Sequence, residues 1–497
     1  MKKTFFTLCL LLGIGAVNAQ EKVKEVVSDD YNRNSVSYIF VDRSQPYSAD
    51  VNQFYGSFSI SEKFDVNTLE TKKMSFSCEA GKPANDAQIK KAVNDKNLGK
   101  EIMSYIFNRQ NDGSFDNEIV LQRGRYNADD QDIKNLAAAK VKEMAWEWGE
   151  PLVNSSYIVV YDIYNTAITK DKNGYNTYKV QVKAHAFKLK ATREVLDDFY
   201  GNAWADPTST ADEKAKASEA YNNMNFDLEY VTSVGGTGLS FDTKYTKGSI
   251  YASCVSAYQN VVHNFENSIE AWKVKVSVMS VRPIAAKIGK KEGLKNAARY
   301  QAYSYAEDKN GELKSVKRGM VRATIVADNS GEATGDTKPS LFYQISGVRN
   351  IEEGYVLRQK NDIKLGVGLT LGATTFGFRA GLDCDYIAHI GKRGSITYAM
   401  LNAGYNVQKG AAEVDAMAGV GYGIPLTRFF EITPFAMAGG FYNTETSKIT
   451  TYIAEPGVRL ALTLQPWSIF ISGGAQVLFG NYTDYGASIK FGIKKTF

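Results

Sequence analysis

The last 137 residues of this chain alternate between apolar residues and small or polar residues, which constrains the fold more than any other feature. Between Tyr485 and Phe497, tyrosine, isoleucine and phenylalanine alternate with glycine, serine, lysine and threonine. A period of two places the two sets on opposite faces of a β-strand. The pattern recurs upstream and predicts eight strands, near residues 363–371, 376–388, 395–407, 413–424, 428–442, 451–464, 467–479 and 485–497.

The composition changes near residue 360. Residues 361–497 contain 20 of the 42 glycines, and 20 of these 137 residues are charged, against 91 of the 341 residues in 20–360. Such a difference in glycine and charge content indicates that the two regions of the chain occupy different environments. We therefore expect a signal peptide over residues 1–19, an α+β domain over 20–272, a small β-rich domain over 273–360 and a β-barrel over 361–497.

The strands of a soluble β-sandwich also alternate between apolar and polar residues, but three features favour a membrane barrel over a sandwich. The strands have the 9–14 residues that a tilted membrane strand needs. Aromatic residues gather near the strand ends, where a bilayer meets water. The polar face carries charges of both signs, which a small barrel tolerates inside only as pairs. Glu455 and Arg459 share this face, and the predicted interior charges are Arg379, Asp383, Asp415, Glu431, Glu455, Arg459 and Lys490.

Residues 361–497 resemble the small eight-stranded outer-membrane β-barrels of Gram-negative bacteria, whose last strand typically ends in phenylalanine. In this chain the corresponding strand runs from Tyr485 to Phe497, with Ile489 and Phe491 on its apolar face. The resemblance implies that Tyr485, Ile489, Phe491 and Phe497 form an assembly signal. It also implies two partners, the outer membrane and the machinery that assembles barrels in it.

The N-terminus has the pattern of a secretory signal peptide. Lys2 and Lys3 precede an apolar run from Phe5 to Val17, and small residues up to Ala19 mark a cleavage site. With an even number of strands, the first strand of the barrel begins and the last strand ends on the same side, which is the periplasmic side. We therefore expect an outer-membrane protein with residues 20–360 in the periplasm. The mean hydropathy of -0.30 excludes a polytopic helical membrane protein, and the formal charge of +5 is too balanced to indicate a nucleic-acid partner.

The region before residue 361 mixes helical and strand patterns. Apolar spacing predicts helices over 129–148 and 249–272. The second helix places Cys254 in the core, although a disulfide with Cys78 is left open, because sequence alone cannot determine cysteine pairing.

The Asp171–Gly174 segment predicts a hairpin with a two-residue turn at Asn173-Gly174. The resulting register would place Asp162 opposite His185, as a solvated polar pair.

Known catalytic signatures are missing from the sequence, and only 3 histidines are present. We expect no catalytic residue, no cofactor and no metal. The sequence predicts a non-enzymatic envelope protein, anchored by its barrel, whose periplasmic domain binds a protein or peptidoglycan. One alternative is a component of an outer-membrane secretion or surface-assembly apparatus. A second is a membrane-tethered hydrolase that would use His185 or His263.

Overall fold

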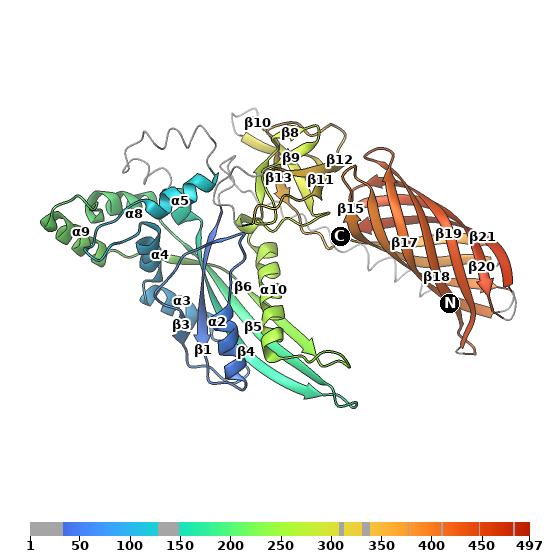
Figure 1. The fold of residues 1–497 in the computed structure, drawn as a ribbon, viewed down its shortest axis with the longest axis horizontal. Helices are drawn as coiled ribbons and strands as arrows, with labels where there is room; N and C mark the ends of the chain where they lie inside the picture. Colours follow the sequence, from blue (N-terminus) through green and yellow to red (C-terminus); the bar gives the residue numbers. More distant parts are fainter. Residues whose placement is uncertain are drawn as a thin grey trace.

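The computed structural model describes residues 33–127, 149–307, 313–330, 338–375, 377–408, 411–446, 448–480 and 483–497. The predicted signal peptide and the predicted helix over 129–148 lie outside these residues. In the described part of the chain, three sheets follow one another, and the last closes into a barrel of eight antiparallel strands. Figure 1 shows the barrel at one end of the molecule, the second sheet beside it and the first sheet with its helices at the other end. The predicted fold class is confirmed.

The first sheet has the strand order β2-β1-β4-β5-β6, with β3 also paired to β1. β1 is parallel to β4, whereas β4, β5 and β6 form an antiparallel meander that leaves β6 at the edge. The strands are β1 (Ser35–Asp42), β2 (Asp65–Val66), β3 (Lys73–Ser75), β4 (Ser156–Lys170), β5 (Asn176–Leu189) and β6 (Leu228–Phe241).

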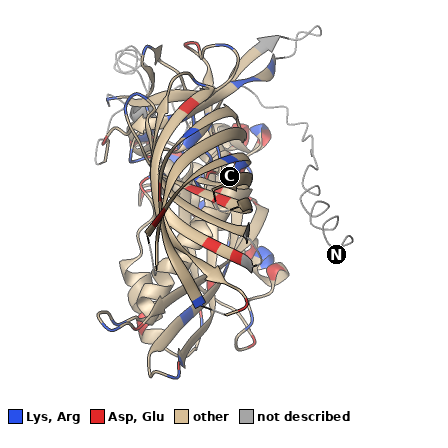
Figure 2. Cartoon of the chain, turned by 90° about the vertical axis from the view of Figure 1, so that its right-hand side faces the viewer, with Lys and Arg blue, Asp and Glu red and all other residues tan. Residues whose placement is uncertain are grey.

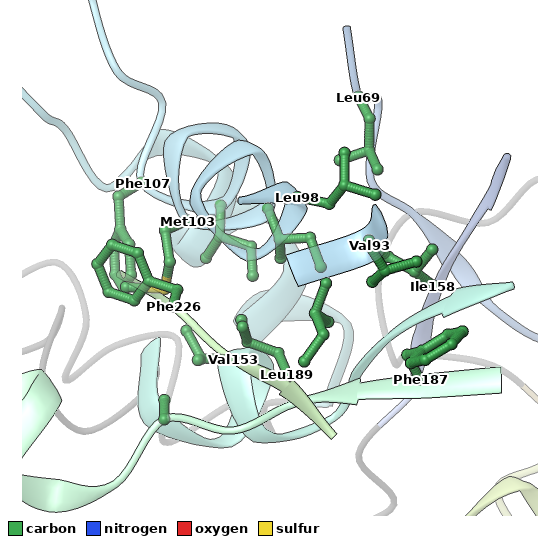
Figure 3. Packing of buried hydrophobic residues seen from close by; sticks show 14 of the residues in the cluster. Leu69, Val93, Leu98, Met103, Phe107, Val153, Ile158, Phe187, Leu189 and Phe226 are labelled. Atoms are coloured by element: carbon green, nitrogen blue, oxygen red, sulfur yellow. The ribbon is translucent and has the colours of Figure 1, made fainter. Parts of the chain in front are cut away.

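Helices cover both faces of this sheet, so β4 is apolar on both sides. Ile158 and Val160 of β4 face one hydrophobic core, whereas Val159 and Tyr161 face the other. Figure 3 shows the first core, in which Leu189 of β5 lies below Leu98 and Phe187 lies below Val93 and Ile158. Its helices are α3 (Asp86–Asp95), α4 (Leu98–Ile106), α5 (Glu118–Asn127), α8 (Arg193–Asp198), the π-helix η1 (Phe199–Ala203) and α9 (Ala211–Asn223).

On the opposite face lie α2 (Ser48–Ser57) and α10 (Ile250–Ser268), followed by the 3-10 helix η2 (Glu270–Trp272). The predicted helix over 249–272 is thus confirmed, with the Ser249 hydroxyl accepting the Ala252 amide at 3.0 Å as its N-cap. Cys254 of α10 is fully buried between the helix and the sheet, whereas Cys78 packs against the core on the other side of the sheet. Both are free thiols, so the disulfide that the sequence left open is not formed.

The hairpin between β4 and β5 corrects two sequence expectations. Its turn is longer than two residues, because the Asp171 carboxylate accepts the amides of Asn173 and Tyr175, both at 2.8 Å. A bulge between Ile163 and Asn165 then shifts the register by one residue. Asp162 therefore lies opposite Lys183, and His185 lies opposite Val160. Asp162 and His185 are both fully buried, so the predicted solvated pair does not exist.

The second sheet has the order β7-β13-β10-β11-β12-β9-β8 and encloses its own hydrophobic core, in which Tyr300 packs edge-on against Phe342. Its strands are β7 (Lys275–Ser277), β8 (Ser280–Val281), β9 (Ile284–Ala286), β10 (Arg299–Glu307), β11 (Leu313–Ile325), β12 (Ser340–Ser346) and β13 (Val356–Gln359).

The barrel closes where β14 pairs with β21, from Gly366 opposite Thr496 to Thr374 opposite Ser488. Its high glycine content has a steric cause, because a Cβ atom at Gly404 would overlap the Arg379 guanidinium inside the barrel. The strands are β14 (Leu365–Thr374), β15 (Gly377–Ile390), β16 (Ile396–Gln408), β17 (Ala411–Pro425), β18 (Phe430–Asn443), β19 (Lys448–Leu464), β20 (Trp467–Phe479) and β21 (Thr483–Thr496). Each overlaps one of the eight predicted strands.

Candidate functional site

The outer face of the barrel is an apolar band between two rings of aromatic side chains. We call the end at which β14 begins and β21 ends the proximal rim, and the opposite end the distal rim. Exposed aromatic residues at the proximal rim are Tyr386, Tyr422, Phe430, Trp467 and Phe497. Those at the distal rim are Phe378, Tyr405, Tyr442, Tyr452, Phe479 and Tyr485. Exposed aliphatic side chains fill the space between, including Leu369, Leu382, Leu401, Val420, Leu460, Ile471 and Ile489.

The height of this band can be obtained from β20, because Trp467 and Phe479 stand 12 residues apart at its two ends. A rise of about 3.4 Å per residue and a tilt of about 45° separate the two rings by about 29 Å along the barrel axis. The hydrocarbon core of a bilayer is about 30 Å thick. Figure 2 shows how few charged residues lie along these strands.

Inside the barrel, charged side chains form paired networks. Near the proximal rim, the Arg459 guanidinium donates to Asp385 at 2.7 Å and to Asp383 at 3.0 Å, and Lys494 also bonds to Asp385. Arg459 also lies over the Phe470 ring, 4.5 Å from its centroid. All these side chains are nearly inaccessible to solvent, so each charge is compensated by a neighbour rather than by water.

A second group lies nearer the distal rim. Arg379 binds both carboxylate oxygens of Asp415, at 2.6 and 2.7 Å, and Asn406 donates to the same carboxylate. Asn402 joins the two groups, because it accepts from Arg379 and donates to Asp383 at 3.2 Å. The network therefore extends along the barrel axis.

A third group of hydrogen-bonded side chains surrounds Glu455 inside the barrel. Its carboxylate accepts from Lys490 at 2.5 Å, from Gln476 at 2.8 Å and from Ser488 at 3.1 Å. Glu455 does not pair with Arg459, because four residues along a strand separate the two side chains by about 13 Å.

All seven predicted interior charges point into the barrel, and six of them are buried. The seventh, Glu431, lies at the proximal rim, where it accepts from the hydroxyls of Tyr398 at 3.1 Å and Thr433 at 2.8 Å. Four further polar residues that were not among the predicted interior charges also lie inside the barrel, namely Asp385, Asn402, Asn406 and Lys494. Each stands an even number of residues from an inward-facing residue of its own strand, which is the signal that could have identified it. The predicted assembly-signal residues Tyr485, Ile489, Phe491 and Phe497 are all exposed on the outer face.

Side chains fill the interior. Apolar residues complement the charged groups, among them Met400, Met417, Phe435, Met437, Phe441 and Ile453. At the proximal rim a cavity of about 60 Å³ is lined by Asp385, Glu431, Lys494 and Arg322 of the second sheet. A volume of this size holds a few water molecules. It is no channel for a larger solute.

The second sheet is joined to the proximal rim by polar contacts. Arg322 pairs with Asp362 just before β14, and Asn296 accepts the Ile390 amide at 2.9 Å. The Lys364 ammonium donates to the Asn296 carbonyl at 2.6 Å, and Ala297 packs into the barrel's own hydrophobic cluster. The second sheet thus covers this end of the barrel.

In the first sheet, Asp162 accepts from Arg43 at 2.6 and 2.7 Å and from the Ala84 amide at 2.8 Å. His185 lies on the same face, and burial lowers its pKa to about 4. His263 lies on the exposed side of α10, so the fold does not bring together the two histidines considered for hydrolysis. Over the described residues, no group of three or more His, Cys, Asp or Glu side chains is arranged to hold a metal ion.

No protein-family model and no curated protein matches this chain. A structure from the de novo design of transmembrane β-barrels is similar to the barrel, with 15% identity and a TM-score of 0.19. The match covers 28% of this chain and 98% of the designed one. The described helices include none with the length and apolar character needed to cross a bilayer. The fold thus defines a closed eight-stranded barrel with a two-sheet region before it.

Proposed function

We propose that this chain is an outer-membrane-anchored, non-enzymatic envelope protein whose N-terminal region binds a partner in the periplasm. The observation that carries the proposal is the apolar band of about 29 Å between two aromatic rings, around an interior whose charges are paired. A soluble barrel would leave this band in water, where it would promote aggregation.

The location of the other regions follows from the barrel. The second sheet lies at the proximal rim, where the chain also enters the barrel at β14 and ends after β21. The apolar run from Phe5 to Val17 has the pattern of an export signal. We therefore assign the proximal rim to the periplasmic side. The last strand, with Phe497, is the segment that the barrel-assembly machinery would recognise.

The edge strand β6 supports a protein partner in preference to peptidoglycan. Val231, Leu239 and Phe241 are exposed on it, and an edge strand with exposed apolar side chains is a surface on which another chain can pair. Asn260 and Asn264 of α10 already bond the carbonyls of Thr237 and Gly235. Leu239 and Phe241 lie beyond these two bonds, towards the end of the strand.

The membrane assignment is tested by a heat-shift gel and by protease treatment of cells. A folded membrane barrel should migrate faster before boiling than after it. Protease should cleave residues 33–359 only in cells whose outer membrane has been permeabilised. Equal mobility before and after boiling, or cleavage in intact cells, would contradict the assignment.

The partner is tested with a photo-crosslinking residue at Phe241 in intact cells. The matched control is the same residue at Val66, which is 44% exposed on β2 at the opposite edge of the sheet. We expect a protein adduct from position 241 and none from position 66. Adducts of equal yield, or none at either position, would contradict the role of β6.

A further inference from the structure

A turn of the second sheet is held against the proximal rim by one arginine. Arg428, in the connection between β17 and β18, donates to the carbonyls of Gly347 at 3.1 Å and Arg349 at 2.9 Å. It also donates to the Asn350 side chain at 2.6 Å. Gly347 has a φ of 104°, which a side chain would disfavour. The 347–350 turn therefore has a defined shape and a defined position on the rim.

This turn presents an apolar side chain to the outside. Val348 is 90% exposed, the highest value among the large hydrophobic residues exposed in the described chain. Its neighbours Gly347 and Arg349 are the two residues whose carbonyls Arg428 binds. Arg428 itself stands between Leu426, 62% exposed, and Phe430 of the proximal aromatic ring, 53% exposed. Val348 thus lies in a turn that Arg428 ties to the chain segment at which the apolar band begins.

Exposed cations accompany Val348 at this rim. Arg349 is part of the turn, and Lys392 and Arg393 lie in the connection between β15 and β16. That connection also contacts the second sheet, because a Cβ atom at Gly394 would overlap the Tyr343 ring of β12. Basic side chains beside an apolar tip have the composition of a surface that binds anionic lipid.

We propose that the 347–350 turn is a membrane contact separate from the barrel. Val348 enters the boundary between head groups and acyl chains of the periplasmic leaflet, and the cations around it meet lipid phosphates. The proposal rests on the proposed membrane location of the barrel. The occupant is lipid, because Arg428 ties the turn to the segment between the exposed Leu426 and Phe430, where the apolar band begins, and because the cations of this rim complement phosphate. Such a contact would hold the second sheet close to the membrane surface.

The test uses the full chain, with Cys9→Ala, Cys78→Ala and Cys384→Ala and with the fully buried Cys254 retained, in vesicles of phosphatidylethanolamine and phosphatidylglycerol. A polarity-sensitive fluorophore is attached at Val348→Cys, at Leu460→Cys within the band, four residues from the proximal end of β19, or at Tyr245→Cys, which is 86% exposed beyond the edge strand β6. Some vesicles contain lipids with a nitroxide quencher near the head group. We expect quenching at positions 348 and 460 but none at position 245. Adding Arg428→Ala should reduce the quenching at 348 at least twofold and leave that at 460 unchanged.

The possible failures are distinguishable. Without quenching at 460, the barrel does not span the bilayer and the proposed function fails. If the fluorophore is quenched at position 460 but is as unquenched at position 348 as at position 245, only the proposed lipid contact fails. A blue-shifted emission at 348 without quenching would mean that protein covers the turn, which also overturns the proposal.

Discussion

The Arg322 guanidinium and the Asp362 carboxylate form an ion pair across the junction between the second sheet and the barrel, with side chains only 1% and 4% exposed. Arg322 also donates to the Ala297 carbonyl at 2.6 Å, and Ala297 packs against the barrel. One residue therefore links β11, the loop before β10 and the segment that enters β14. Because a buried charge is costly without its partner, the pair makes the junction depend on both residues.

We expect Asp362→Asn to loosen this junction. The substitution leaves the buried Arg322 charge uncompensated, which costs about 3 kcal/mol. Hydrogen exchange should accelerate at the Ala297 amide, which bonds to the Ala323 carbonyl. The matched control is Asp328→Asn, since the Lys290–Asp328 pair has side chains 56% and 60% exposed and should contribute little. Equal exchange in wild type and Asp362→Asn would show that the pair does not hold the junction.

Glu455→Gln should destabilise the barrel itself. It leaves the Lys490 ammonium buried without its carboxylate, at a cost of about 3 kcal/mol. We expect the temperature at which the folded band disappears from an unboiled gel to fall by several degrees. Glu445→Gln, which alters an exposed carboxylate in the connection between β18 and β19, should leave it unchanged. An unchanged temperature for Glu455→Gln would mean that the interior pair contributes no net stability.

The sequence could predict the eight strands because side chains at alternate positions of a strand face the outside or the interior of the barrel. Glycines at inward positions such as Gly404 strengthened that pattern. This alternation does not specify which side chains inside the barrel contact one another. Arg459 and Glu455 share a face of β19, yet each finds its partner on another strand, and those distances depend on the closed barrel.

The first sheet shows a second limit of sequence analysis. The longer turn and the bulge between Ile163 and Asn165 each shift the register by one residue, and together they place Asp162 opposite Lys183 instead of His185. Both residues are buried by segments that are distant in the sequence, since Asp162 bonds to Arg43 and Ala84, and Asp86 at the start of α3 acts electrostatically on His185. The 347–350 turn is a similar case, because its significance comes from Arg428, 81 residues away from Gly347.

His185 should make the N-terminal region sensitive to acid. Burial lowers its pKa to about 4 in the folded protein, whereas the unfolded chain has the ordinary value of 6.5. Between these values the unfolded state binds more protons, so stability is complete above pH 6.5 and falls as the pH is lowered towards 4. The two pKa values limit the loss to about 3 kcal/mol.

We expect His185→Leu to lose less stability than wild type between pH 7 and pH 4.5, as measured by chemical denaturation. The variant lacks the proton uptake that favours unfolding. His263→Gln alters a histidine on the exposed side of α10 and should retain the wild-type dependence. Identical pH dependence in His185→Leu and wild type would assign the acid sensitivity to groups other than His185.

The final strand offers a test of barrel assembly. The Phe497 amide donates to the Leu365 carbonyl at 2.8 Å, at the seam where β21 meets β14, and its side chain is 43% exposed on the outer face. Phe497→Ala keeps this backbone bond, so the finished barrel should retain nearly all its heat resistance. The amount of folded barrel in the outer membrane should nevertheless fall severalfold if, as we propose, Phe497 belongs to the segment that the barrel-assembly machinery recognises. Phe479→Ala removes a comparably exposed aromatic side chain at the distal rim and should leave the amount near that of wild type. Equal losses in the two variants would mean that both act through stability in the membrane and that Phe497 has no separate role in recognition.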